Sequence, residues 1–312
     1  MVPKSLNPTR LGASMFSVGD IYHRIKAFKS RLGPGPHNNL FFAKIDVQAA
    51  FDTIPQDAII TLLNQIPQHV QYALLKHVEI AMLDAAGPKN VTKPYKRWHI
   101  TAAAAAERNG GGVCAQLSFP DRVEQSLALK RRDTVFVDSA VHRTLKARDM
   151  LALAAEHIAQ NLVRIGKKYY RQKEGIPQGS VLSSMLCSWF YADLERRRLG
   201  FLLDSEDCLL MRLIDDFLLI TTDRAKAERF VEVMTAGVPE YGLTVNPKKS
   251  LVNFDMVVGG EPVPRPEGVR DRFPYCGLWI DCKTLGIVKQ RDGLQEPGMS
   301  YTAVPCSISQ SF

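Results

Sequence analysis

Three aspartates carry the clearest chemical signal in this sequence. Asp46 ends a largely apolar run that begins at Phe41, and Asp215 and Asp216 stand side by side between two apolar runs. Carboxylate oxygens are the hard ligands that Mg²⁺ prefers, and a pair of such ions holds the attacking and leaving oxygens of an in-line phosphoryl transfer. The three residues together predict a site for two Mg²⁺ ions and phosphoryl-transfer chemistry.

The adjacent pair Asp215-Asp216 has a common alternative explanation, which is a solvated turn. Neighbouring strand residues face opposite sides of a sheet, so two adjacent carboxylates reach one site only where the chain turns. The apolar runs at 209–211 and 217–220 predict a β-hairpin that buries this turn. Burying two like charges costs several kcal/mol each unless a cation compensates them, so a metal ion is the simplest explanation.

Asp46 is predicted to lie on a strand whose two faces differ. Lys44 and Asp46 point to one side of it, and the other side is formed by Phe41, Ala43, Ile45 and Val47. Further along, Asp52 is interpreted as a loop cap. Phe51 could lie against a nucleotide sugar, or it could pack in the core, as a lone Phe usually does.

A glycine-rich turn, Gly-Ile-Pro-Gln-Gly-Ser at 175–180, precedes an apolar helical pattern. Pro177 stiffens this turn, Gly179 permits close backbone approach, and Gln178 offers an amide to a base or a template backbone. Such turns also occur in ordinary loops. The sequence thus contains, in this order, a carboxylate on a strand, a glycine-rich turn into a helix, and paired carboxylates in a hairpin. This order predicts a nucleic-acid polymerase.

The composition is that of a globular protein with a basic surface. The chain has 312 residues, of which 46% are hydrophobic and 23% charged, and a net charge of +8 that suits a polyanionic partner. Its six cysteines form no C-x-x-C pair, which predicts free thiols in a reducing compartment, with neither zinc nor disulfides. We find no secretory signal and no apolar run approaching the ~18 residues of a membrane span.

Apolar periodicity predicts most of the remaining elements. A helix is expected after Ser17, with Gly33 as its end, and another helix after Pro55. The apolar residues Val70, Leu74, Val78 and Ala81 predict one more helix.

The middle of the sequence is predicted to be a mainly helical insertion over about residues 60–165. A long helix is expected over 151–165, with Gly166 as its end. Within the insertion, the basic and aromatic stretch from Lys93 to Trp98 suits either stacking on single-stranded bases or a plain strand. Residues 286–312 show no periodicity and are predicted to form a disordered tail.

Taken together, these segments resemble the reverse-transcriptase domain of the telomerase reverse transcriptase family over about residues 10–285. The long separation between Asp46 and Gln178 is similar to the family's insertion in fingers. The segments that resemble the family's motifs A, B′, C, D and E are, in that order, residues 44–56, 175–187, 213–221, 238–254 and 273–281. Residues 11–14 and 20–21 resemble the segment that precedes the first catalytic strand.

The resemblance implies an α+β fold, with a reverse-transcriptase palm made of an antiparallel sheet with helices on one face in the split βαβ arrangement. It divides the chain into a fingers remnant with the first palm strand at 1–59, the insertion in fingers at 60–165, the palm at 166–285 and the tail. It also implies a fragment-like chain that depends on missing telomerase domains or accessory subunits.

The resemblance assigns roles residue by residue. It makes Asp46, Asp215 and Asp216 the catalytic and metal-binding residues, with the Val47 carbonyl as a further ligand. It assigns nucleotide and template contacts to Phe51, Gln178, Gly179 and Lys249, although a lysine at the last position fits a solvated turn as well. It assigns the primer grip to Tyr275, Cys276 and Gly277.

The implied reaction is attack of a primer 3′-hydroxyl on a dNTP, templated by a bound RNA. The implied partners are telomerase RNA and a telomeric single-stranded DNA primer, and the implied place is the nucleus, at the telomeric region of chromosomes. Two alternatives stay open. One is a retroelement or intron-encoded reverse transcriptase, and the other is an inactive, truncated fragment that binds nucleic acid.

Overall fold

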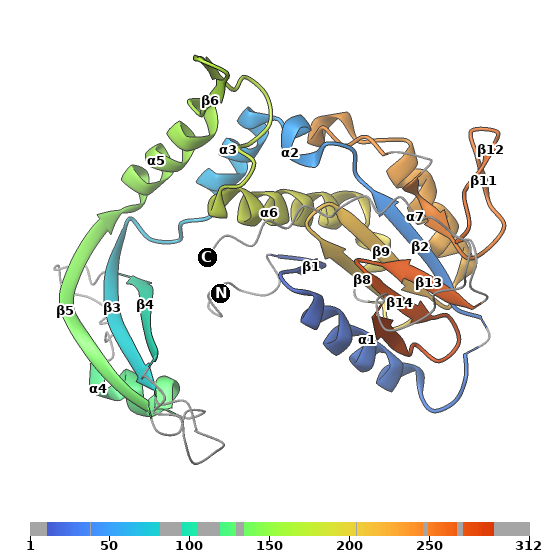
Figure 1. Ribbon diagram of the computed structural model, residues 1–312, viewed down its shortest axis with the longest axis horizontal. Helices are drawn as coiled ribbons and strands as arrows, with labels where there is room; N and C mark the ends of the chain where they lie inside the picture. The colour runs from blue at the N-terminus through green and yellow to red at the C-terminus, as the bar shows by residue number, and fades with distance from the viewer. Residues whose placement is uncertain are drawn as a thin grey trace. The chain divides into compact units, whose positions relative to one another are not determined.

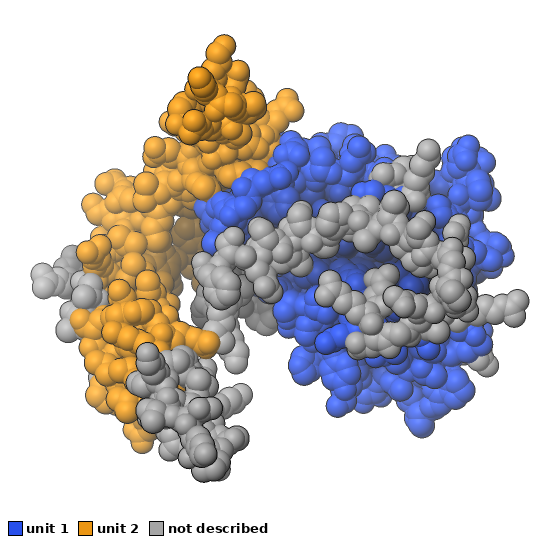
Figure 2. Space-filling model, in the orientation of Figure 1, with its two compact units in different colours: residues 1–55, 178–312 blue, residues 56–177 orange. Residues whose placement is uncertain are grey.

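The computed structural model describes residues 11–37, 39–81, 95–104, 119–128, 134–203, 205–245, 249–266 and 271–289. The chain divides into two compact units, which Figure 2 shows in blue and orange. Unit 1 comprises residues 1–55 and 178–312, and unit 2 comprises residues 56–177. The domain boundaries expected from the sequence stay a prediction.

Unit 1 is built on a five-stranded sheet with the order β1-β8-β9-β2-β10 (Figure 1). Strand β1 runs parallel to β8, and every other neighbouring pair is antiparallel. The strands are β1 (Ser14–Met15), β2 (Phe41–Asp46), β8 (Cys208–Leu213), β9 (Asp216–Thr221) and β10 (Leu251–Val252). Strands β8 and β9 form the hairpin that the apolar runs around Asp215 and Asp216 predict.

Both faces of this sheet are covered. On one face, helix α1 (Val18–Leu32) packs with the small sheet of β13 (Arg272–Tyr275), β14 (Leu278–Asp281) and β15 (Ile287–Lys289), in a core cluster that includes Leu218. On the other face lie α6 (Val181–Arg198), whose Tyr191 ring meets Phe217 edge-on, and α7 (Arg224–Thr235), which contacts β2 and β9. Helices on both faces correct the expectation of helices on one face, since side chains alternate along β9 and both sets are apolar.

The local sequence of helix α1 explains where this helix begins and ends. The helix begins after Ser17, as predicted, and Ser17 and Asp20 form a capping box at its start. Its buried residues Ile21, Ile25 and Phe28 recur at helical spacing, and the chain leaves the helix at Gly33, where φ is 87°. The smaller elements of unit 1 are α2 (Ala50–Thr53), the 3₁₀ helices Gly200–Leu202 and Pro239–Tyr241, and the hairpin of β11 (Val257–Val258) and β12 (Glu261–Pro262).

The described residues of unit 2 are not mainly helical, which corrects the prediction for the insertion. Its largest element is a three-stranded antiparallel sheet, β4-β3-β5, made of β4 (Tyr95–Ala104), β3 (Gln71–Ala81) and β5 (Thr134–Lys146). The residues at 70, 74 and 78 that predict a helix are separated by four positions. Because four is also a multiple of the two-residue period of a strand, they fit one face of a strand as well as one face of a helix.

The remaining elements of unit 2 are α3 (Gln56–Asn64), α4 (Phe119–Arg122), a short π-helix (Val123–Leu127), α5 (Ala147–Ala159) and the hairpin of β6 (Leu162–Ile165) and β7 (Lys168–Arg171). Helix α5 ends at Ala159, before the predicted end of the helix at residue 165. Gly166, with φ 63°, lies in the turn of the β6–β7 hairpin and not at a helix end.

The disordered tail predicted at 286–312 is wrong for its first residues, because β15 pairs with β14 as far as Lys289. Residues 290–312 lie outside the described residues, as do Cys114 and Cys306. Four cysteines are free thiols, namely Cys187, Cys208, Cys276 and Cys282. In the part of the chain that the structure describes, no helix is long and apolar enough to span a membrane.

Candidate active site

The sheet register brings two of the three predicted aspartates together. Asp46, at the end of β2, is the direct antiparallel partner of Asp216, at the start of β9. Side chains of directly opposed residues project from the same face, so these two carboxylates are neighbours. The long stretch of chain between them loops out of the sheet without disturbing this pairing.

Asp215 lies in the turn between β8 and β9, next to this pair. The preceding residue, Ile214, has a φ of 61°, which is unusual for a β-branched residue and lets the chain reverse within two residues. Burial, reinforced by the charges of Asp216 and Asp46, raises the pKa of Asp215 to about 6. Burial also raises the pKa of Asp216, with Lys44 opposing and Asp46 reinforcing the shift.

Two lysines place positive charge on these carboxylates. The ammonium of Lys44 lies 3.4 Å from Oδ1 of Asp216, and that of Lys249 lies 3.5 Å from Oδ2 of Asp46. Lys249 was expected to contact a nucleotide, and here its partner is one of the predicted catalytic carboxylates. Lys44 was not predicted, although a lone lysine in an apolar strand two positions before Asp46 is a visible signal.

The donor set suits a divalent cation in chemical type. Oδ1 of Asp216 is buried and makes no hydrogen bond of good geometry within the described residues. The Lys44 ammonium, 3.4 Å away, compensates its charge, and a divalent cation could do the same. Within the same residues, however, no three His, Cys, Asp or Glu side chains are already gathered as a metal-binding group. The Val47 N–H donates to the Asp215 carbonyl at 3.4 Å, so Val47 joins β2 to the turn. The ligand roles of all four residues stay a prediction.

A buried ion pair supports the turn from behind. Arg212 and Glu195 are both fully buried, and Nε of Arg212 donates to Oε1 of Glu195 at 2.6 Å. The same guanidinium donates to the carbonyl of Ile214 at 3.1 Å and to that of Ser188 at 2.9 Å. Arg212 thus ties the turn that holds Asp215 to α6, the helix that follows the glycine-rich turn.

Glu195 extends this support to the segment before α1. Its Oε2 accepts the N–H of Ala13 at 2.7 Å, beside Gly12, where φ is 54°. A Cβ at Gly12 would lie 2.0 Å from that oxygen, so a glycine is required there. Sequence reasoning missed Arg212 and Glu195, although an arginine within the apolar strand 208–213 was a signal that could have indicated the first.

The predicted primer-grip residues lie next to Asp216. Cys276 and Gly277 form the two-residue turn between β13 and β14, with φ of 47° and 74°, as a type I′ hairpin requires. The Tyr275 hydroxyl donates to the Asp216 carbonyl at 2.9 Å, and Sγ of Cys276 lies 3.9 Å from Oδ2 of Asp216. This hairpin and the start of β9 are thus directly joined.

Gln178 and Asp52 form a contact that the sequence did not predict. Nε2 of Gln178 lies 3.1 Å from both carboxylate oxygens of Asp52, on α2. Asp52 therefore holds the Gln178 amide, a role beyond the loop cap expected for it. Gly179 adopts a φ of 82°, and a Cβ added there would meet no atom within 4 Å, while Phe51 is half-buried in α2. The nucleotide and template contacts expected of these residues stay a prediction.

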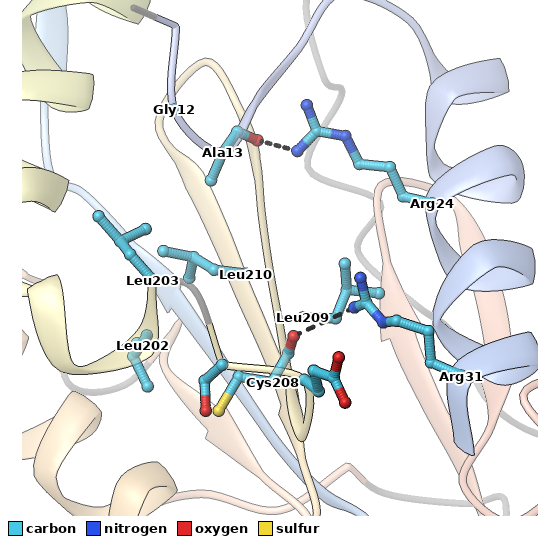
Figure 3. A pocket seen from close by; sticks show the side chains of 11 residues that line it. Gly12, Ala13, Arg24, Arg31, Leu202, Leu203, Cys208, Leu209 and Leu210 are labelled. Carbon is cyan, nitrogen blue, oxygen red and sulfur yellow. Dashed lines mark hydrogen bonds between the residues drawn. The ribbon is translucent and has the colours of Figure 1, made fainter. Parts of the chain in front are cut away.

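A cleft of about 420 Å³ lies elsewhere in unit 1 (Figure 3). It is lined by Arg24 and Arg31 of α1, and by Cys208 and Leu210 from the start of β8. Arg24 donates to the Ala13 carbonyl at 2.8 Å across it. Asp215 follows the opposite end of β8, so this cleft is separate from the carboxylates.

Comparison with known proteins gives a consistent result. Residues 132–280 match the family described as reverse transcriptase (RNA-dependent DNA polymerase). The telomerase reverse transcriptase of Canis lupus familiaris is 33% identical over 289 residues, which are 91% of this chain and 24% of that protein. That of Takifugu rubripes is 30% identical over 297 residues, 95% of this chain and 27% of that protein. The chain spans about a quarter of the length of these curated relatives.

Solved structures show the same fold. Telomerase from Candida tropicalis, in complex with a TWJ fragment of telomeric RNA, superposes with a TM-score of 0.57 and 20% identity, covering 96% of this chain and 36% of that one. Apo telomerase from Candida tropicalis, truncated from its C-terminal domain, gives a TM-score of 0.54 and 17% identity over 89% of this chain and 41% of that one. The α+β reverse-transcriptase fold is thus confirmed. The chain is a homologue of the telomerase reverse transcriptases and has their reverse-transcriptase fold.

Proposed function

We propose that this chain is the catalytic reverse-transcriptase domain of a telomerase, which copies a bound RNA template onto the 3′ end of a DNA primer. The observation that carries the proposal is the pairing of Asp46 with Asp216, next to Asp215, in a chain homologous to telomerase reverse transcriptases. The substrates are then dNTPs and a telomeric single-stranded DNA primer, the template is telomerase RNA, and the place is the telomeric region of chromosomes in the nucleus.

Reverse transcription by in-line transfer requires divalent cations at these carboxylates. We infer two Mg²⁺ ions, held by Asp46, Asp215 and Asp216 with the Val47 carbonyl, which would activate the primer 3′-hydroxyl and stabilise the leaving pyrophosphate. The carboxylates supply the negative charge for such ions. Lys249, now 3.5 Å from Asp46, supplies positive charge close to where the pyrophosphate leaves.

The surrounding residues position the two nucleic-acid strands in this proposal. The turn at Cys276 and Gly277, joined to Asp216 through the Tyr275 hydroxyl, would support the primer end next to the carboxylates. Gln178, held by Asp52, and Gly179, with its left-handed backbone, would contact the nucleotide and the template, and Phe51 the sugar. Because the chain spans about a quarter of its relatives, the remaining telomerase domains or accessory subunits are proposed as partners.

The test is primer extension on an RNA template by the purified chain, together with dNTP binding measured with and without Mg²⁺ or Mn²⁺. We expect cation-dependent binding of dNTP and extension that Asp46→Asn abolishes. Asp57→Asn, an exposed aspartate at the start of α3, is the matched control and should behave like the wild type. Extension by Asp46→Asn at the wild-type rate, or the lack of any cation-dependent nucleotide binding, would refute the proposal.

Acidification is expected to weaken cation binding through Asp215. Its pKa is raised to about 6, so below that pH a proton competes with the cation for the carboxylate. The apparent Kd for Mn²⁺ should rise about tenfold for each pH unit below about 6, as expected for one competing proton. Mn²⁺ titrations from pH 5 to 8 measure this, and Asp215→Asn should make the dependence on pH weaker, leaving the part that Asp216, whose pKa is also raised, contributes. A wild-type Kd that stays constant between pH 5 and 7 would contradict the expectation.

A further inference from the structure

One face of the unit 2 sheet combines apolar and basic side chains. Directly opposed strand residues project from the same face, so the pairing of β3 with β4 and β5 defines its members. This face, called here the Trp98 face, is formed by Tyr72, Leu74, Lys76, Val78 and Ile80 of β3, Lys96, Trp98, Ile100 and Ala102 of β4, and Val135, Val137, Arg143 and Leu145 of β5.

The apolar side chains of the Trp98 face are unusually exposed. Trp98 is 50% exposed, Ile100 63%, Val135 61% and Val137 44%, although Val78 between Trp98 and Val137 is buried. Large apolar side chains that are exposed together on one surface often mark an interaction site. We therefore expect this face to bind a partner.

Its charge indicates what that partner is. The ammonium of Lys76 lies 4.2 Å from the centre of the Trp98 ring, and that of Lys96 lies 4.9 Å from it. The cation–π contacts hold both lysines beside the indole. Arg143 adds a third positive charge two rows away, and none of the described residues of this face is acidic. An anion that also offers flat apolar groups complements such a surface.

The opposite face of the same sheet is built differently. There, the ring of the buried His77 stacks on His99 with centroids 4.9 Å apart, and His99 Nε2 lies 2.6 Å from the Glu79 carboxylate. Helix α4 covers that face, because Phe119 packs on His77 and Arg122 donates to the Thr101 hydroxyl at 2.7 Å. The centre of that face, around His77 and Glu79, is packed internally, whereas the large apolar side chains of the Trp98 face are exposed.

We propose that the Trp98 face binds single-stranded DNA. Bases of an unpaired strand stack on exposed aromatic rings, and lysines beside the ring meet the flanking phosphates. A base would take the place of one lysine on the indole, and the displaced ammonium would remain within reach of a phosphate. Duplex DNA keeps its bases stacked inside the helix and could use only the positive charges.

The side chains favour DNA over RNA. Proteins distinguish RNA through contacts with its 2′-hydroxyl, which donates as well as accepts hydrogen bonds. Apart from the Tyr72 hydroxyl, which already accepts the N–H groups of Gln68 and His69, the described side chains of the Trp98 face are apolar or are donors only, so they offer no further acceptor for that hydroxyl. Isoleucine and valine can instead contact a thymine methyl group.

Binding is tested on the full chain in EDTA and without dNTPs, so that failure of the proposed catalysis would leave the result unaffected. The probe is a fluorescein-labelled oligo(dT) of about 12 nucleotides, followed by fluorescence anisotropy. Trp98→Ala is expected to weaken binding by roughly 5- to 150-fold, the range that loss of one stacked base produces. Trp98→Phe should stay within about threefold of the wild type, since it keeps an aromatic ring.

The lysines are tested by salt dependence. Replacing Lys76 and Lys96 by Gln should lower the slope of log Kd against log salt by about 1.4, or about 0.7 for each phosphate contact on a single strand. Tyr22→Ala and Lys26→Gln, an exposed aromatic residue and an exposed lysine of α1 in unit 1, are matched controls and should leave affinity and slope unchanged. Thermal unfolding checks that every variant is folded.

A cross-link places the strand on the face directly. Oligo(dT) carrying 5-iododeoxyuridine is expected to cross-link to the peptide that contains Trp98, as mass spectrometry identifies. The proposal is overturned if folded Trp98→Ala binds oligo(dT) as the wild type does, because the face then serves another partner, such as a protein. It is also overturned if Trp98→Ala weakens binding of oligo(rU) and leaves oligo(dT) unaffected, which would assign the face to RNA.

Discussion

Replacing Asp215 by Asn is expected to abolish primer extension and, at the same time, to stabilise the folded chain. The pKa of about 6, against an ordinary value of 3.8, means that burial and the neighbouring carboxylates disfavour the charged form. Unfolding relieves that cost at neutral pH, where the group is charged in both states. The difference corresponds to about 3 kcal/mol at most, and partial exposure to solvent lowers the expected gain to about 1–2 kcal/mol.

The pH dependence gives the sign of this effect. A carboxyl group whose pKa is raised by folding binds a proton more tightly in the folded chain, so its contribution is most favourable below about pH 4 and becomes unfavourable as pH rises through about 6. Asp215→Asn should therefore raise the melting temperature by a few degrees at pH 7.5 and leave it nearly unchanged at pH 4.

Thermal unfolding in EDTA at both pH values measures the stability of this variant, and primer extension measures its activity. Asp57→Asn, the exposed control, should change the melting temperature little at either pH. A variant that loses activity and is also less stable than the wild type at pH 7.5 would contradict this account, because the loss would then reflect damage to the fold. A stabilised but inactive variant would show that the charged Asp215 carboxylate is needed for activity and lowers the stability of the folded chain.

The strands that carry the aspartates could be predicted from sequence because charge and apolar alternation coincide there. Asp46 stands at a fixed position in the alternation of β2, and the apolar runs around Asp215 and Asp216 require a hairpin. Register is strongly determined where faces are buried, since a slip by one residue would expose the core. Helix α1 was predicted for a similar reason, because its apolar residues Ile21, Ile25 and Phe28 recur at helical spacing after Ser17.

Other features depend on contacts that no local pattern encodes. Gln178 meets Asp52 across 126 positions, and Arg212 meets Glu195 across 17 positions and two different elements. A polar residue reveals little of its partner when that partner lies on another element. The prediction of a helix at β3 was wrong for a different reason. Apolar spacing by four residues satisfies both the helical and the strand period.

The buried pair of Arg212 and Glu195 should have the largest effect on stability. Arg212→Met leaves the Glu195 carboxylate buried with no guanidinium, and breaking such a pair costs about 3–5 kcal/mol. It also removes the hydrogen bonds to the Ile214 and Ser188 carbonyls. We expect this variant to unfold at a much lower temperature or denaturant concentration than the wild type, as circular dichroism would measure.

The double variant Arg212→Met, Glu195→Leu separates stability from positioning. Replacing a buried ion pair by apolar side chains of similar volume is often neutral or stabilising, so the double variant should recover most of the lost stability. Part of the loss will remain, because Glu195 also accepts the N–H of Ala13. Its turn at Ile214 would still lack the guanidinium that fixes the carbonyl before Asp215, so catalysis should remain impaired.

The expected signature is a stable double variant with a reduced kcat and a KM for dNTP close to that of the wild type. Such a split would place the role of Arg212 in the alignment of the carboxylates, since a merely structural role would let activity return together with stability. Arg224→Met with Glu228→Leu, an exposed ion pair on α7, is the matched control and should change neither quantity much. Full recovery of kcat in the stable Arg212–Glu195 double variant would show that the turn keeps its geometry without the guanidinium.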